Sequence, residues 1–186
     1  MTALTRLQAA LFAPFDRDDW LLPTVARIVF LAVFFFYFNN SIGTKISSFE
    51  IPLLSIKVPL ALTPDASSAF VQMFPKAFET AGYDETAMPS IYWVLAVIGT
   101  WAEFLLPVFL ILGLFTRLSA IGMIGFVLVQ TFTDVVGHSI ALGSLFNNLP
   151  ELVDTRMLWI FLLLVLAIKG AGPFSIDRIF APRTHS

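Results

Sequence analysis

Long apolar stretches alternate with short polar segments along most of this chain. Three of the stretches run for about 20 residues with few charges, which is the length that a helix needs to cross the hydrocarbon core of a bilayer. A fourth stretch is strictly apolar only from Met157 to Ile168, so it reaches a spanning length if its helix begins near residue 150. The pattern predicts four spanning helices, at about residues 21–40, 91–114, 117–137 and 150–169.

Two further segments show apolar residues at helical spacing without the length to span. At the N-terminus these residues are Leu4, Leu7, Leu11 and Phe15. They predict a short helix lying in the membrane interface. In the long loop at residues 44–90, a stripe that includes Phe70, Phe74 and Phe78 predicts an amphipathic helix on the outer membrane surface. Pro75 is expected to kink that helix.

The composition places the chain among membrane proteins. Of its 186 residues, 58% are hydrophobic and 13% are charged, which is more apolar surface than a soluble domain of this length can bury. There is no cysteine, which excludes disulfides, thiol catalysis and iron–sulfur ligation. No basic stripe indicates nucleic acid, and we expect no metal site. The expected fold is an all-α, polytopic membrane four-helix bundle that forms a single domain over residues 1–186.

Lysine and arginine are concentrated on one side of the predicted spans. That side holds both termini and the turn between the second and third spans, with Arg6, Arg17, Arg117, Lys169, Arg178 and Arg183. Cytoplasmic flanks of spanning helices are enriched in these residues, so we expect both termini in the cytoplasm and the loop at residues 44–90 outside. Arg27, within the first span, is expected to extend toward the cytoplasmic headgroups.

One carboxylate, Glu103, interrupts the second span about halfway along. An ionisable group at mid-bilayer costs about 2.5–3.5 kcal/mol on insertion scales, so it usually faces the protein interior and has a partner. With a rise of about 1.5 Å per residue, Glu103, Gln130 and Arg156 each lie about 20 Å from the cytoplasmic ends of their spans. We therefore predict a buried ion pair between Glu103 and Arg156, with Gln130 beside it. Such a pair is either a ligand or proton site or a structural clasp that specifies helix order.

Polar residues continue outward from that level. Gln130, Asp134 and His138 are spaced four residues apart and share one face of the third span, and Asp154 approaches from the fourth. They predict a polar vestibule that opens to the outer side and leads to Glu103. Asp134 and His138 also lie near the expected interface, where a polar side chain needs no functional explanation.

Two short motifs adjoin the predicted helices. The connection between the second and third spans contains Gly113, Thr116 and Arg117, and it is so short that it forces an antiparallel helical hairpin. After the last span, the tail contains Gly172, Pro173, Ser175 and Asp177. Asp177 and Ser175 are expected to cap a short cytoplasmic helix, with Ser175 as its N-cap.

Glu103, the turn at residues 113–117 and the tail at residues 172–177 together resemble the DoxX family of small four-helix bacterial membrane proteins. The resemblance extends over all four predicted spans. It implies a location in the bacterial cytoplasmic (inner) membrane. It also implies that Glu103 and the motif residues Thr116, Arg117, Ser175 and Asp177 correspond to the family's own motif positions. Similar proteins have been linked to quinol oxidase or thiosulfate:quinone oxidoreductase subunits and to membrane complexes that handle oxidative stress.

The resemblance implies a redox-associated membrane subunit whose polar layer around Glu103 binds a quinone headgroup or a proton. The chain itself is not expected to hold a cofactor, because His185 lies in the tail and cannot form a paired haem site with His138 within one bundle. A partner oxidoreductase, either a membrane or a soluble protein, would bring the redox centre. The chain itself is expected to contact membrane lipid and can also form a homo-oligomer. Two alternatives remain open: a small-solute or ion pathway, and a membrane scaffold that docks a partner through the long outer loop.

Overall fold

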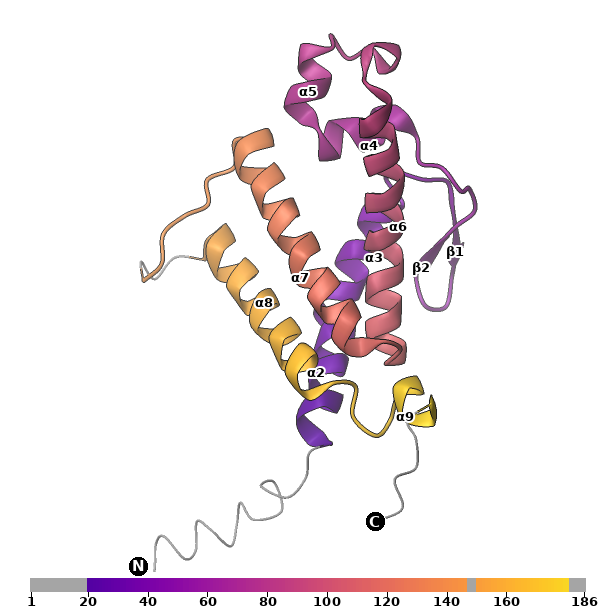
Figure 1. Cartoon of the computed structure of the whole chain (residues 1–186), viewed down its shortest axis with the longest axis vertical. Coiled ribbons are helices and arrows are strands. Elements are labelled where there is room, and N and C mark those ends of the chain that lie inside the picture. The colour runs from indigo at the N-terminus through magenta and orange to yellow at the C-terminus, as the bar shows by residue number, and fades with distance from the viewer. Residues whose placement is uncertain (1–19, 147–149, 181–186) are drawn as a thin grey trace, which may run out of the picture.

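The structure is a computed structural model that describes residues 20–146 and 150–180, and it is mostly helical (Figure 1). The first long helix is continuous in three parts: α2 (Leu21–Phe30), the π-helical stretch η1 (Leu31–Phe35) and α3 (Phe36–Ile42). The other long helices are α6 (Ser90–Leu112), α7 (Thr116–Phe132) with its π-helical end η3 (Thr133–Gly137), and α8 (Leu152–Lys169).

Three helices are long and apolar enough to cross a membrane, namely Leu21–Ile42, Ser90–Leu112 and Thr116–Gly137. Their bounds differ by no more than two residues from the first three predicted spans. The 18-residue α8 is shorter than these and carries Asp154, Arg156 and Lys169. The described part of the chain is therefore a membrane protein with three candidate spans and a fourth, more polar helix beside them.

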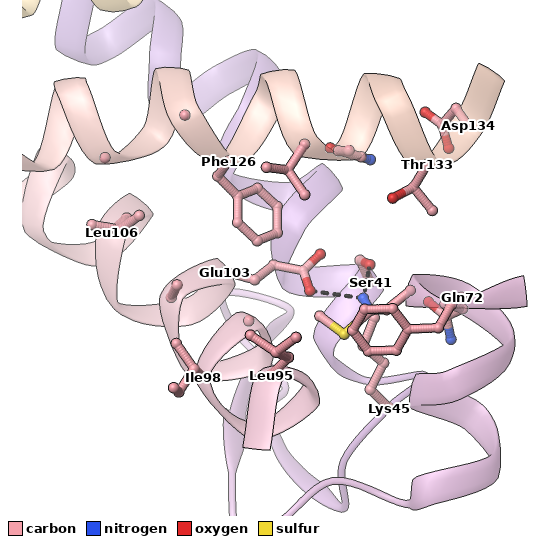
Figure 2. A pocket seen from close by; sticks show the side chains of 18 of the residues that line it. Ser41, Lys45, Gln72, Leu95, Ile98, Glu103, Leu106, Phe126, Thr133 and Asp134 are labelled. Carbon is pink, nitrogen blue, oxygen red and sulfur yellow. Dashed lines mark hydrogen bonds and ion pairs between the residues drawn. The ribbon is translucent and has the colours of Figure 1, made fainter. Parts of the chain in front are cut away.

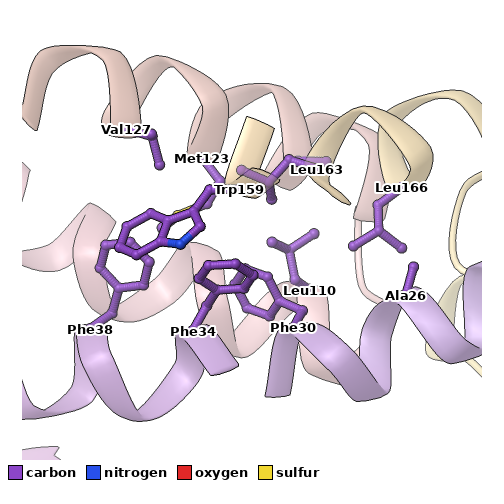
Figure 3. Close-up of a cluster of buried hydrophobic side chains, with 11 residues drawn as sticks. Ala26, Phe30, Phe34, Phe38, Leu110, Met123, Val127, Trp159, Leu163 and Leu166 are labelled. Atoms are coloured by element: carbon purple, nitrogen blue, oxygen red, sulfur yellow. The ribbon is translucent and has the colours of Figure 1, made fainter. Parts of the chain in front are cut away.

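The long helices pack around one apolar core. α7 lies against both α6 and α8, and α2 lies against α8 and α6. Aromatic rings from the first helix, Phe30, Phe34 and Phe38, meet Trp159 and Leu163 of α8 in this core (Figure 3). Phe34 and Trp159 pack edge to face with ring centroids 4.8 Å apart. Lipid tails are as apolar as these side chains, so close van der Waals packing rather than water exclusion holds the helices together here.

The molecule has two distinct ends (Figure 1). The turn end holds the start of α2, the α6–α7 turn, the end of α8 and the short helix α9 (Ile176–Phe180). The loop end holds α4 (Ala66–Met73), α5 (Pro75–Thr80), η2 (Glu85–Ala87), η3 and the start of α8. α6 and α7 are joined directly at the turn end and separate toward the loop end.

The segment between α3 and α6 differs from the prediction. The apolar stripe of α4 and α5 is buried within the protein, where Ala69, Phe70 and Phe78 pack with Met88 and Ala96, so the predicted contact with the membrane surface is wrong. A single amphipathic helix could not follow the bend between α4 and α5. The break occurs at Phe74, one residue before Pro75, as the proline predicted.

A short antiparallel hairpin, β1 (Ser48–Ile51) and β2 (Ile56–Pro59), was not expected in an all-α chain. Asn39 of α3 holds it in place, because its side chain accepts a hydrogen bond from the Lys57 backbone N–H and donates one to the Lys57 carbonyl. Each strand is only four residues long, the shortest alternation that indicates a strand, so the hairpin gives a weak signal in the sequence. The predicted N-terminal interfacial helix lies outside the described residues.

Candidate functional site

Glu103 is buried in α6, with 2% of its surface exposed, and its partner is Lys45 (Figure 2). The Lys45 Nζ lies 2.7 Å from the Glu103 Oε2 and also donates to the Ser41 Oγ at 2.6 Å. The predicted ion pair between Glu103 and Arg156 is therefore wrong. α8, which carries Arg156, packs against α7 and α2 and has no extensive contact with α6, so equal depth in the membrane does not bring the two side chains together.

The geometry after α3 explains how Lys45 reaches this position. The helix ends at Ile42, and the Lys45 backbone N–H bonds back to the Ile42 carbonyl in a tight turn. The Lys45 carbonyl then accepts from the Asp65 N–H, which ties the turn to the start of α4. The side chain consequently lies inside the protein, 5% exposed, between α3 and α6.

Arg156, which is buried, forms a second ion pair, with the partly buried Asp134 of η3. Its Nη2 lies 2.6 Å from the Asp134 Oδ2, and its guanidinium carbon lies 4.4 Å from the centre of the Trp159 ring. Its Nε and Nη1 are buried without a hydrogen-bond partner among the described residues. The two predicted charges thus occur in two separate pairs, one joining α3 to α6 and one joining η3 to α8.

A cavity of about 530 Å³ lies between α3, α6, α7 and the end of α4 (Figure 2). The polar side chains that line it are Tyr37, Ser41, Lys45, Gln72, Glu103, Gln130, Thr133 and Asp134. The Gln130 Nε2 donates to the Tyr37 hydroxyl at 2.7 Å, whereas the Gln130 Oε1 is buried without a partner in the described part of the chain. Buried polar atoms are rarely left unsatisfied, so this side of the cavity can accept a hydrogen bond from a bound molecule or water. We call it the Glu103 cavity.

Exposed apolar side chains line part of the Glu103 cavity. Leu95 and Ile98 of α6 and Val129 of α7 line it and are exposed. On the side of the loop end, Gln72 and Met73 line it, and the Gln72 carbonyl is 3.1 Å from the His138 Nε2. Gln130 and Asp134, two residues of the predicted vestibule, therefore line a cavity that also has exposed apolar lips on α6 and α7.

Two of the predicted vestibule residues do not line the cavity. The Asp154 carboxylate accepts from the Glu151 N–H and completes a capping box at the start of α8. His138 is exposed, and its Nε2 lies near the carbonyl of Gln72, which lines the cavity. The structure thus brings Glu103, Gln130 and Asp134 together at the cavity, with Arg156 behind Asp134, and leaves Asp154 and His138 outside it.

The sequence model of the DoxX family matches residues 22–135, from the start of α2 into η3. The chain belongs to the DoxX family. The matched region contains Lys45, Glu103 and Asp134 but ends before α8 and the tail, both of which the resemblance was expected to include. No curated protein and no solved structure matches the chain.

At the turn end of this DoxX protein, the tail folds back onto the α6–α7 hairpin. Gly113 ends α6 with a φ of 67°, and Phe115 precedes α7. The Asp177 carboxylate accepts the backbone N–H groups of Phe115 at 2.7 Å and of Thr116 at 2.9 Å. Asp177 therefore caps α7 from a distant part of the chain, while Ser175 caps α9 as predicted, through the Arg178 N–H.

Arg27 completes the turn-end network. Its guanidinium donates to the Leu110 carbonyl at 3.1 Å and the Ala171 carbonyl at 3.2 Å, and also to the carbonyls of Ile111 and Phe174. The expectation that Arg27 extends to the headgroups is wrong, because carbonyls at the end of α6 and in the tail provide acceptors inside the protein.

The charge of Asp177 is favoured by its surroundings. Burial acts to raise its pKa, but the backbone hydrogen bonds from Thr116 and Phe115 and the positive charge of Arg27 together hold the pKa of Asp177 below its ordinary value. The carboxylate thus remains ionised at the N-terminus of α7, where a negative charge is stabilised by the helix dipole.

Sequence reasoning missed Lys45. This residue lies in the loop at residues 44–90, where no site residue was predicted. A usable signal was its position five residues after the predicted end of the first span, close enough to fold back against a carboxylate in the membrane.

Proposed function

We propose that this DoxX protein binds the headgroup of a bilayer-soluble quinone in the Glu103 cavity. It would do so as a membrane subunit that works with a partner oxidoreductase. The observation that supports the proposal most strongly is the combination of apolar lips and a charged floor. A ligand entering between Leu95 and Val129 comes from the lipid phase, while Glu103 and Lys45 provide polar partners at the inner end. Ligand sites of this kind are concave, mostly apolar and equipped with a few placed polar groups.

The redox association rests on the family rather than on a redox centre in this chain. The sequence has no cysteine and two histidines, so an electron carrier would come from the partner. Within the complex, this subunit would hold the headgroup in position and shield it from water. The same cavity with its charged floor also suits a small-solute pathway, which is the second candidate.

Purified protein in lipid nanodiscs provides the test. A short-chain quinone should raise the thermal midpoint, since a ligand at about 100 times its Kd stabilises the folded state by about 2.7 kcal/mol. Gly125 lines the cavity with open space where a Cβ would lie, so Gly125→Phe should fill the cavity and abolish the shift. Leu128→Phe, at an exposed position on the same helix, is the matched control.

Equal shifts in the wild type and Gly125→Phe would show that the quinone acts from the bilayer alone, which contradicts the proposal. Solute flux across protein-containing liposomes, lost in Gly125→Phe, would favour the pathway instead. If no small molecule changes the thermal midpoint, the interpretation of the protein as a membrane scaffold would be favoured.

We further propose that α8 is a fourth span and that the turn end faces the cytoplasm of a bacterial cell. α8 extends for about 27 Å, close to the thickness of the hydrocarbon core. Arg117, Lys169 and Arg178 gather at the turn end, in the pattern of cytoplasmic flanks. An impermeant thiol reagent applied outside should label Glu79→Cys and not Ser186→Cys. The reverse pattern would invert the topology.

A further inference from the structure

The ammonium group of Lys45 has one donor more than its partners use. An ammonium carries three N–H groups, and the described residues accept two of them, at the Ser41 Oγ and the Glu103 Oε2. The side chain is 5% exposed and lines the Glu103 cavity, where Figure 2 shows it between Glu103 and Gln72. A buried donor left without an acceptor is costly, so an acceptor oxygen in the cavity would satisfy the group.

The charges on the cavity wall favour a neutral acceptor over an anion. Lys45 is the cation of the lining, and its charge is matched by Glu103. Asp134 adds a second carboxylate, whose partner Arg156 lies behind the wall rather than in the lining. Each of the two carboxylates is thus already paired with a cation, so an anionic ligand would find no unmatched positive charge in this region of low dielectric. A carbonyl oxygen accepts the same hydrogen bond and needs no such charge.

We propose that Lys45 is the residue that recognises the ligand, by donating its third N–H to a neutral carbonyl oxygen of the headgroup. This inference rests on the proposed function of the cavity. It adds which chemical group of the ligand Lys45 recognises. Glu103 is then a positioning residue, which holds the ammonium in the cavity and balances its charge. The selected ligand is a carbonyl-headed amphiphile, and a fatty-acid carboxylate is discriminated against.

The experiment compares three probes with the same ten-carbon tail: a decyl-substituted benzoquinone, decylbenzene and decanoate. Their affinities are measured on the full-length protein in nanodiscs of neutral lipid. The wild type should bind the benzoquinone about tenfold or more tightly than either of the others, as expected for one hydrogen bond from a charged donor.

Lys45→Met alone would leave Glu103 buried without a partner, so the informative variant is the double substitution Lys45→Met with Glu103→Gln. It removes both charges and the donor together. It should lose the preference for the benzoquinone, binding it about as weakly as decylbenzene. Lys76→Met, at an exposed lysine of α5 away from the cavity, is the control and should bind as the wild type does.

A second measurement needs no variant. The infrared carbonyl stretch of isotope-labelled benzoquinone should shift to lower frequency on binding to the wild type, because an ammonium donor weakens the C=O bond. An unshifted carbonyl, a double variant that binds as tightly as the wild type, or stronger binding of decanoate would each overturn the role of Lys45 while leaving the cavity a quinone site. No saturable binding of the benzoquinone to the wild type would instead remove the proposed function itself.

Discussion

The turn end and the loop end of this DoxX protein use buried polar groups in opposite ways. At the turn end, Arg27 and Asp177 satisfy backbone groups at the end of α6 and the start of α7, and the helices meet without a gap. Toward the loop end, Lys45 and Glu103 pair with each other in the wall of a cavity, and α6 and α7 separate around it. The first arrangement fixes the fold, whereas the second leaves volume and unsatisfied atoms that a ligand can use.

The difference follows from what each polar group faces. The carbonyls of Leu110 and Ile111 belong to the last turn of α6, which is followed by no further helical turn to donate N–H groups to them, so an arginine nearby is an efficient donor. Glu103 lies in the middle of α6, away from the helix ends, and the charge of its carboxylate is balanced by another charged side chain, Lys45. The charge of Glu103 is therefore neutralised by Lys45, a side chain from outside the α6–α7 hairpin.

The largest expected effect is at the Glu103 cavity. Glu103→Gln should destabilise the protein by about 3–5 kcal/mol, because it leaves the Lys45 ammonium buried without a counter-charge. Reversible unfolding in mixed detergent micelles measures the loss. The double variant with Lys45→Met should recover most of it, since no uncompensated charge remains. A single variant within about 0.5 kcal/mol of the wild type would mean that the pair is hydrated, and the contrast between the two ends would disappear.

Arg27 provides the corresponding test at the turn end. Arg27→Met removes the donors to four backbone carbonyls and should cost about 2–3 kcal/mol in the same unfolding assay. Arg27→Lys should recover only part, because an ammonium cannot match the geometry of the guanidinium fork. Arg178→Met, at an exposed arginine of α9, is the control and should stay within about 0.5 kcal/mol. An Arg27→Met variant as stable as that control would show that the tail does not stabilise the hairpin.

Asp177 should have a smaller effect with a defined pH dependence. Asp177→Ala removes the cap of α7 and should cost about 1 kcal/mol at neutral pH. Because the pKa of Asp177 is below its ordinary value of 3.8, its contribution is complete above that pH and is lost as the pH falls through the lowered value. The stability difference between wild type and variant should therefore shrink only below pH 3.8. A difference that persists unchanged in stronger acid would exclude the charged cap as its cause.

The sequence was sufficient to predict the helices and their ends, but it did not predict which side chains pair between helices. Apolar length located three spans, the short connection predicted the α6–α7 hairpin, and Ser175 was identified as an N-cap, because each depends on neighbours along the chain. Depth counting placed Glu103 and Arg156 at one level, but it carries no information on which helix faces which. The pairing instead depends on α8 packing beside α7 and α2, which is a property of the whole fold.

The segment between α3 and α6 was the least predictable part. Its apolar stripe was correctly recognised, but a stripe of this kind fits a lipid surface and a protein surface equally well. In the structure, Ala96 of α6 provides the small residue against which Phe70 and Phe78 pack. The lysine that follows α3 turns inward for the same reason, since this segment folds back over α6 rather than spreading on the bilayer.

The smallest expected effect locates the boundary between the packed and the hollow parts of the α6–α7 hairpin. Gly122 and Gly125 lie about one turn apart on α7, and both line the Glu103 cavity. A Cβ at Gly122 would lie 3.2 Å from the Leu106 Cδ2, whereas a Cβ at Gly125 would meet nothing within 4 Å. Gly125→Ala should therefore raise stability by about 0.5–1 kcal/mol through helix propensity alone. Gly122→Ala should gain less, because Leu106 must shift to accept the new methyl group. Both variants are compared by the same reversible unfolding assay, and a gain at Gly122 that equals the gain at Gly125 would place the packed boundary nearer to the turn end than the structure does.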